Sequence, residues 1–150
     1  MQITMRRNPV ARAFTLIELI AVIVVLAILS GIAIPKYFDY SDKAKASACK
    51  GTLGAVRSAI ANHYMKEQLN TGTATYPTLQ DLKTVGTVMQ EPMPANPYNN
   101  SNEVQAGTWT APTSQNPNPP QSVSGTHGWN YDATLGRFWA NSSVAGENSW

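Results

Sequence analysis

The chain has 150 residues, enough for one small domain or for a domain with an appendage. Charged residues make up only 13%, about half the share usual in soluble domains. Arg6, Arg7 and Arg12 precede Phe14, which leaves 8 of the 11 basic residues against 9 acidic ones in the rest of the chain. Net charge therefore provides no basic face for nucleic acid. The single cysteine, Cys49, excludes an internal disulfide and a cysteine-based zinc site.

Residues 14–34 form an apolar run of 21 residues whose one charged member is Glu18. A bilayer core needs about 20 helical residues, so this run can span a membrane. Because arginines and no acids precede it, the positive-inside rule places residues 1–13 in the cytoplasm and the chain beyond Pro35 outside. The apolar run has two simple interpretations. It could be a cleaved signal peptide, although the apolar region of such a peptide is usually shorter, or it could be a plain membrane anchor.

Glu18 separates these interpretations. An acid at the centre of a membrane helix costs about 2.5–3.5 kcal/mol, although one near the helix end can extend to the interface at lower cost. The functional alternative is a buried positive partner, yet no lysine or arginine occurs between Arg12 and Lys36. Cleavage before Phe14 would create a suitable α-amino group four residues from Glu18.

The segment FTLIEL at residues 14–19, followed by the apolar run and Pro35, resembles the class III signal sequence of type IV pilins and type II secretion pseudopilins. The resemblance implies that a prepilin peptidase cuts between Ala13 and Phe14 and methylates the new amine. It also implies that Glu18 is the assembly residue. The family usually has glycine before the cut, where this chain has Ala13.

Two residues predict a helix break at the outer end of the apolar run. Pro35 lacks an N–H group and clashes one turn back, and Gly31 weakens the same stretch. We therefore expect a kink or local melting there, and the resemblance implies a melted stretch in assembled filaments.

Helical periodicity resumes after Pro35, and residues 36–68 are expected to form an amphipathic helix that continues into the head. Its apolar stripe has spacings of three and four residues and comprises Ala46, Cys49, Leu53, Val56, Ile60 and Tyr64. A helix over residues 14–68 would measure about 80 Å, so half of it needs lipid or other subunits. Cys49 lies on the stripe, which favours a core residue over a reactive thiol.

The remainder, residues 69–150, is predicted to form the head. Residues 79–85 suggest a short helical turn with Thr78 as its N-cap. Seven of the ten prolines fall in a long loop over residues 90–125, in which residues 112–122 should be mobile or extended.

Residues 128–131 and 137–140 read as a hairpin closed by residues 132–136, with a third strand within residues 104–110. We expect an antiparallel sheet packed on the helix, which gives an α+β, pilin-like fold. The head is most similar to that of a major pseudopilin, a weaker resemblance than that of the N-terminal segment.

No nucleotide-binding loop, zinc-protease motif or fixed catalytic triad is recognisable, and we expect no enzyme. The resemblance raises calcium as an alternative to our expectation of no cofactor. Its oxygen ligands would come from Asn99, Asn100, Asn102, Glu103 and Asp132, although Asn-rich turns are more often only turns. Exposed tryptophans could form a glycan-binding face, but we expect three of the four to fill the core.

These observations predict a single-pass inner-membrane protein with its head in the periplasm or an extracellular filament. The function expected is a structural subunit of a type II secretion pseudopilus or a type IV pilus-like filament. Its partners would be the prepilin peptidase, further copies, other pilin-like subunits and an inner-membrane assembly platform, with no nucleic acid. The alternative is a membrane-anchored binding module for a glycan or protein, which does not polymerise.

Overall fold

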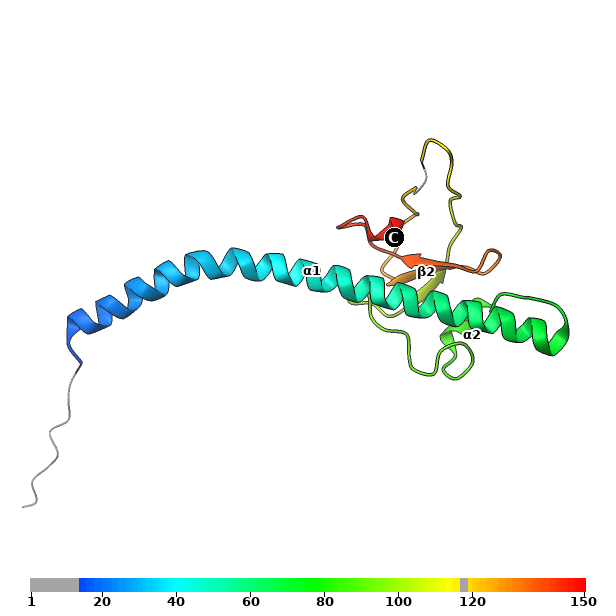
Figure 1. The fold of residues 1–150 in the computed structure, drawn as a ribbon, viewed down its shortest axis with the longest axis horizontal. Coiled ribbons are helices and arrows are strands. Elements are labelled where there is room, and N and C mark those ends of the chain that lie inside the picture. Colours follow the sequence, from blue (N-terminus) through cyan, green and yellow to red (C-terminus); the bar gives the residue numbers. More distant parts are fainter. Residues whose placement is uncertain (1–13, 117–118) are drawn as a thin grey trace, which may run out of the picture. The chain divides into compact units, whose positions relative to one another are not determined.

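The structure, a computed structural model, describes residues 14–116 and 119–150 (Figure 1). The predicted leader, residues 1–13, lies outside the described residues. The chain divides into two compact units, one ending at Tyr40 and the other comprising Ser41–Trp150. The elements in chain order are α1 (Leu16–Thr71), α2 (Leu79–Lys83), β1 (Val104–Ala106), β2 (Trp129–Asp132), β3 (Arg137–Ala140) and a 3-10 turn (Glu147–Ser149). This order confirms the α+β class, with a long N-terminal helix and a small C-terminal sheet.

α1 is helical through both Gly31 and Pro35, so the described structure shows no melting at these residues, and the kink stays a prediction. The missing N–H of Pro35 leaves the carbonyl of Gly31 without its helical partner. One lost hydrogen bond does not end a helix whose neighbouring residues keep theirs. Melting of this stretch inside an assembled filament stays a prediction.

The apolar stripe on the second part of α1 forms one wall of the core, as predicted. Cys49, Leu53, Val56 and Ile60 are all buried. They pack with side chains of α2 and all three strands, namely Leu82, Val104, Trp129, Tyr131, Phe138 and Ala140. Figure 1 shows the sheet lying along this part of the helix.

The predicted hairpin is present, with β2 and β3 antiparallel and Trp129 opposite Ala140. Gly136 closes the turn at φ 63°, a left-handed conformation that suits glycine. The side chain of Asp132 stabilises the turn, because its Oδ1 accepts hydrogen bonds from the backbone N–H and the hydroxyl of Thr134 at 2.9 and 2.7 Å.

The third strand lies where it was expected, but the prediction of an antiparallel sheet is wrong for it. β1 runs parallel to β2, with Val104 opposite Trp129, and the strand order is β1-β2-β3. Parallel neighbours need a crossover of about a dozen residues or more. The long segment between Ala106 and Trp129 supplies it by returning the chain to the end of the sheet where β1 begins.

α2 begins with the expected cap. The hydroxyl of Thr78 accepts from the N–H of Asp81 at 3.1 Å, while the carboxylate of Asp81 accepts from the N–H of Thr78 at 2.9 Å. This reciprocal pair is a capping box, which satisfies two N–H groups that the helix itself cannot.

Side-chain amides fasten the crossover segment to the sheet. Asn141 donates to the carbonyls of Ser124 and His127 at 2.7 and 2.8 Å. Gln121 is buried and bonds both the N–H and the carbonyl of Thr110, at 2.6 and 3.0 Å. The buried Gln121 amide thus joins two parts of the crossover segment, and the mobile or extended character of residues 112–122 stays a prediction.

Candidate assembly site

The start of α1 is organised by Thr15 and Glu18. Glu18 Oε2 accepts hydrogen bonds from the backbone N–H and the hydroxyl of Thr15, both at 2.8 Å. In return the hydroxyl of Thr15 accepts from the N–H of Glu18 at 3.3 Å. This arrangement is a capping box like that of α2, and it fixes the direction of the Glu18 carboxylate.

Thr15 is a site residue that the sequence analysis missed. Its signal is present in the sequence, because threonine followed three positions later by glutamate, just before an apolar run, is the pattern of a helix start. Glu18 stands out in the sequence as an isolated acid, and the structure shows Thr15 to be its local partner.

The structure describes only some of the predicted processing and assembly residues. Phe14 is described and is 88% exposed, and Glu18 is also exposed. Ala13 lies outside the described residues, so the cleavage position is not part of this structure. No cation forms an ion pair with Glu18 in the part of the chain that the structure describes.

The apolar residues that follow make no core. Large apolar side chains between residues 16 and 34 are 46–75% exposed. α1 is long and apolar enough to cross a membrane, and its most apolar part is not buried in the described structure. Exposing so much apolar surface to water is unfavourable, so lipid or other protein must cover it. This segment is consistent with a membrane anchor.

The head contains no metal cluster in the described ranges, where no group of three or more histidine, cysteine or acidic residues lies close enough to hold an ion. Of the side chains suggested for calcium, Asn99 donates to the carbonyls of His127 and Asn141. Asp132 accepts from Trp109 and from the hairpin turn, and these bonds hold its pKa below the usual value although burial raises it. Calcium binding stays an untested alternative to the prediction of no cofactor.

The tryptophans divide between core and surface. Trp129 and Trp139 are fully buried, while Trp109 and Trp150 are half-buried. Trp150 packs against the core cluster. The expectation that three of the four fill the core therefore agrees with these positions, and an exposed glycan-binding row of tryptophans is not seen.

Comparisons with known proteins agree with the resemblance. Residues 9–34 match the family described as the prokaryotic N-terminal methylation motif. The chain is 49% identical over 51 residues to the type IV narrow pilus major component of Thermus thermophilus, covering 34% of this chain and 44% of that protein.

Two further relatives are the type IV major alpha-pilin of Moraxella bovis, 43% identical over 49 residues, and the type IV major pilin protein of Myxococcus xanthus, 43% identical over 62 residues. These matches cover 33% and 41% of this chain, and 31% and 28% of the relatives. The chain thus spans less than half the length of each of these three relatives. No solved structure gives a significant match. The predicted resemblance to the type IV pilin family is confirmed.

Proposed function

We propose that the chain is a structural subunit of a filament, polymerising through residues 14–35 after its leader is removed. The main support is the match of residues 9–34 to the methylation motif. This match overlaps an exposed apolar run, residues 14–34, whose one charged side chain is Glu18. The three relatives described above are pilus components, which supports this function for the present chain.

Assembly would use a pair of charges. Cleavage between Ala13 and Phe14 creates an amine, and methylation leaves it able to carry a positive charge. Inside a bundle of apolar helices water is excluded, so an unpaired carboxylate or amine is costly. Glu18 of one copy and the Phe14 amine of another would relieve that cost as a charge-assisted pair. Thr15 would hold the carboxylate in position through its two hydrogen bonds.

The same proposal places the unassembled chain across the inner membrane, with the head outside the cytoplasm. Its partners would be a prepilin peptidase, further copies of itself, other pilin-like subunits and an inner-membrane assembly platform. The filament would be either a type II secretion pseudopilus or a type IV pilus-like fibre. The absence of a second cysteine and the closing hairpin favour the pseudopilus, whereas the matched relatives belong to pili.

The decisive experiment compares Glu18→Gln with Glu18→Ala, measuring sheared or cross-linked filaments in cells lacking the parent chain. Glutamine can replace glutamate in a capping box but carries no charge. If pairing with the amine drives assembly, both variants insert into the membrane and both lose filaments. Glu91→Ala, which removes an exposed acid from the head, is the matched control and should assemble normally.

Two results contradict the charge pair. Normal filaments with Glu18→Gln but not with Glu18→Ala would assign Glu18 a capping role only. Normal filaments with both variants would favour a simple anchor, and the non-polymerising binding module would then be the better function.

Processing has a separate test. The intact mass of protein from native membranes should correspond to a chain that begins at Phe14 and carries one added methyl group. A mass that still includes the leader would contradict the filament function or show that Ala13 prevents cleavage.

A further inference from the structure

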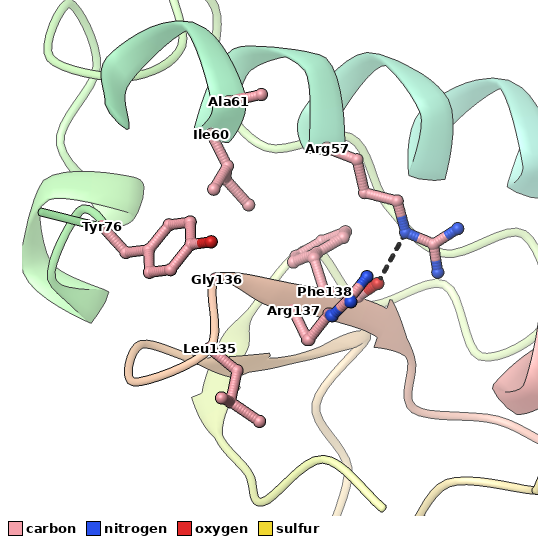
Figure 2. A pocket seen from close by; sticks show the side chains of 8 residues that line it. All are labelled: Arg57, Ile60, Ala61, Tyr76, Leu135, Gly136, Arg137 and Phe138. Carbon is pink, nitrogen blue, oxygen red and sulfur yellow. Dashed lines mark hydrogen bonds between the residues drawn. The ribbon is translucent and has the colours of Figure 1, made fainter. Parts of the chain in front are cut away.

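Two hollows meet at the edge of the head formed by α1 and β3. One, of about 250 Å³, is drawn in Figure 2 with Arg57, Tyr76 and Arg137 among its lining residues. The second, of about 220 Å³, is lined in part by Trp109 and Trp150. Arg57, Arg137 and Phe138 line both hollows. The place where they meet therefore carries two guanidinium groups.

Arg57 enters this place from α1 in a fixed position. Its Nε donates to the carbonyl of Phe138 at 2.9 Å, and its Nη2 donates to the main-chain oxygen of Trp150. Its other terminal nitrogen, Nη1, has no hydrogen bond within the described ranges. Burial lowers the pKa of Arg57, and the positive charge of Arg137 lowers it further.

Arg137 enters from β3 and is exposed. Its guanidinium carbon lies 5.8 Å from the centre of the Trp109 ring, which it covers. Its side chain makes no hydrogen bond or ion pair with any described residue. Asp132 is its partner in the β2–β3 register, but the Asp132 carboxylate is occupied by Trp109 and the hairpin turn. Within the described ranges, neither arginine forms an ion pair with an acidic side chain.

The neighbouring aromatic rings restrict what can bind. The Tyr76 ring contacts the tilted Tyr64 ring at 4.5 Å between centroids, and it lies so close to Gly136 that a Cβ added there would be 2.3 Å away. Lys50 lies over Trp150 at 4.5 Å. These contacts reduce the aromatic face that a sugar ring would need. The free groups are N–H donors, which suit a compact anion.

We propose that Arg57 and Arg137 form a binding site for a compact oxyanion, a carboxylate or a phosphate group. Guanidinium groups bind both through paired N–H donors, and charge-assisted hydrogen bonds are the stronger kind. An oxyanion there would offset the repulsion between the two arginines. It could come from an acidic side chain of a second copy of this chain or from a free anion in solution.

The test uses the full chain in maltoside micelles and follows the Nε–H resonances of Arg57 and Arg137. Sodium acetate and sodium phosphate are each titrated against sodium chloride at constant ionic strength. We expect both resonances to shift in a saturable way with acetate and phosphate. Arg137→Gln should weaken the response at Arg57 about tenfold, as losing a charged hydrogen-bond partner implies.

Lys66→Gln removes a positive charge from an exposed position on α1 and is the matched control. Its titration should match that of the parent chain. The proposal is overturned if acetate and phosphate shift the two resonances no more than chloride does. It is also overturned if Arg137→Gln and Lys66→Gln weaken the response equally, because the response would then depend on net charge alone.

A second measurement distinguishes the two sources of the oxyanion, a neighbouring copy or free solution. It is interpreted only if the first titration shows binding. The titration is repeated on the polymerised form by solid-state resonances of the same arginines. Loss of the response on polymerisation assigns the site to a carboxylate of a neighbouring copy, and a retained response assigns it to a free anion. Binding in micelles does not need polymerisation, so failure of the filament proposal and failure of this one are distinguishable.

Discussion

Arg57 and Phe138 join α1 to the edge of the sheet through a hydrogen bond of 2.9 Å from the guanidinium Nε to the main-chain carbonyl. β3 is an edge strand, whose outer carbonyls have no neighbouring strand to accept from. Arg57 therefore satisfies one of these groups and holds the strand against the helix. The contact between helix and sheet combines this polar link with the buried apolar stripe.

The stripe should carry much of the stability of the head. Leu53 and Ile60 are 1% and 2% exposed, and removing their side chains leaves cavities. Leu53→Ala and Ile60→Ala should each lower the free energy of unfolding by about 2–5 kcal/mol, as measured by denaturant titration with tryptophan fluorescence. Leu69→Ala, at a position that is 85% exposed on the same helix, is the control and should change it by less than about 0.5 kcal/mol. Equal effects at all three positions would contradict this core.

Two glycines should respond to alanine in opposite directions. A Cβ at Gly128 would lie 1.8 Å from the carbonyl oxygen of Ser101, a backbone atom that cannot easily move. Gly128→Ala should therefore destabilise the head by about 3 kcal/mol or more. A Cβ at Gly54 meets nothing within 4 Å, so Gly54→Ala should stabilise α1 by about 0.5–1 kcal/mol. Thermal unfolding of both variants checks the difference, and a shift of the same sign in both would be inconsistent with these positions.

The elements that followed from sequence are those with local signals. Leu53 and Ile60 repeat with the helical period, Gly136 marks a tight turn between two aromatic strands, and Thr78 stands three residues before Asp81. Each signal is contained in a short window, so one sequence suffices to read it.

The features that sequence did not give depend on distant partners. The direction of β1 depends on where the chain returns after residues 107–128, and nothing within Val104–Ala106 encodes that path. Gln121 and Asn141 look like loop residues by type, and only their hydrogen bonds across the crossover show that they are buried. The two arginines of the proposed anion site are 80 positions apart, at Arg57 and Arg137, so the sequence gives no sign that they meet.

Cys49 should be chemically inert while the head is folded. It is fully buried, and burial together with the negative charge of Glu147 raises the pKa of its thiol to about 11. Maleimide labelling near neutral pH should be at least about a hundredfold slower than in guanidinium chloride, because only the thiolate reacts. A Cys49→Ser chain that carries Ser47→Cys places a thiol at an exposed neighbouring position and should label quickly in both conditions. Fast labelling of native Cys49 would show that this part of the core opens.

Glu147 predicts how stability changes with acid. Its carboxylate is fully buried and accepts from the N–H groups of Val144 and Ala145 at 3.1 and 2.7 Å. Burial raises the pKa of Glu147, but hydrogen bonds from Ser142 and the backbone outweigh it, so the folded pKa lies below the ordinary value of 4.5. A lowered folded pKa stabilises the folded state above the unfolded pKa, and that contribution is lost as the pH falls through the folded value.

Glu147→Gln isolates this contribution. Near neutral pH the variant should be less stable than the parent chain by about 1–3 kcal/mol, because an amide replaces a charged acceptor of backbone hydrogen bonds. Below pH 4.5 the difference should shrink as the parent carboxylate becomes protonated. Asp81 and Asp132 also have lowered pKa values, so the quantity to follow is the difference between the two chains in urea titrations across this range. Glu91→Gln, at an exposed position, is the control, and its free energy of unfolding should match that of the parent chain at every pH. If the difference between Glu147→Gln and the parent chain does not change with pH, the buried carboxylate stabilises the head by its shape and not by its charge.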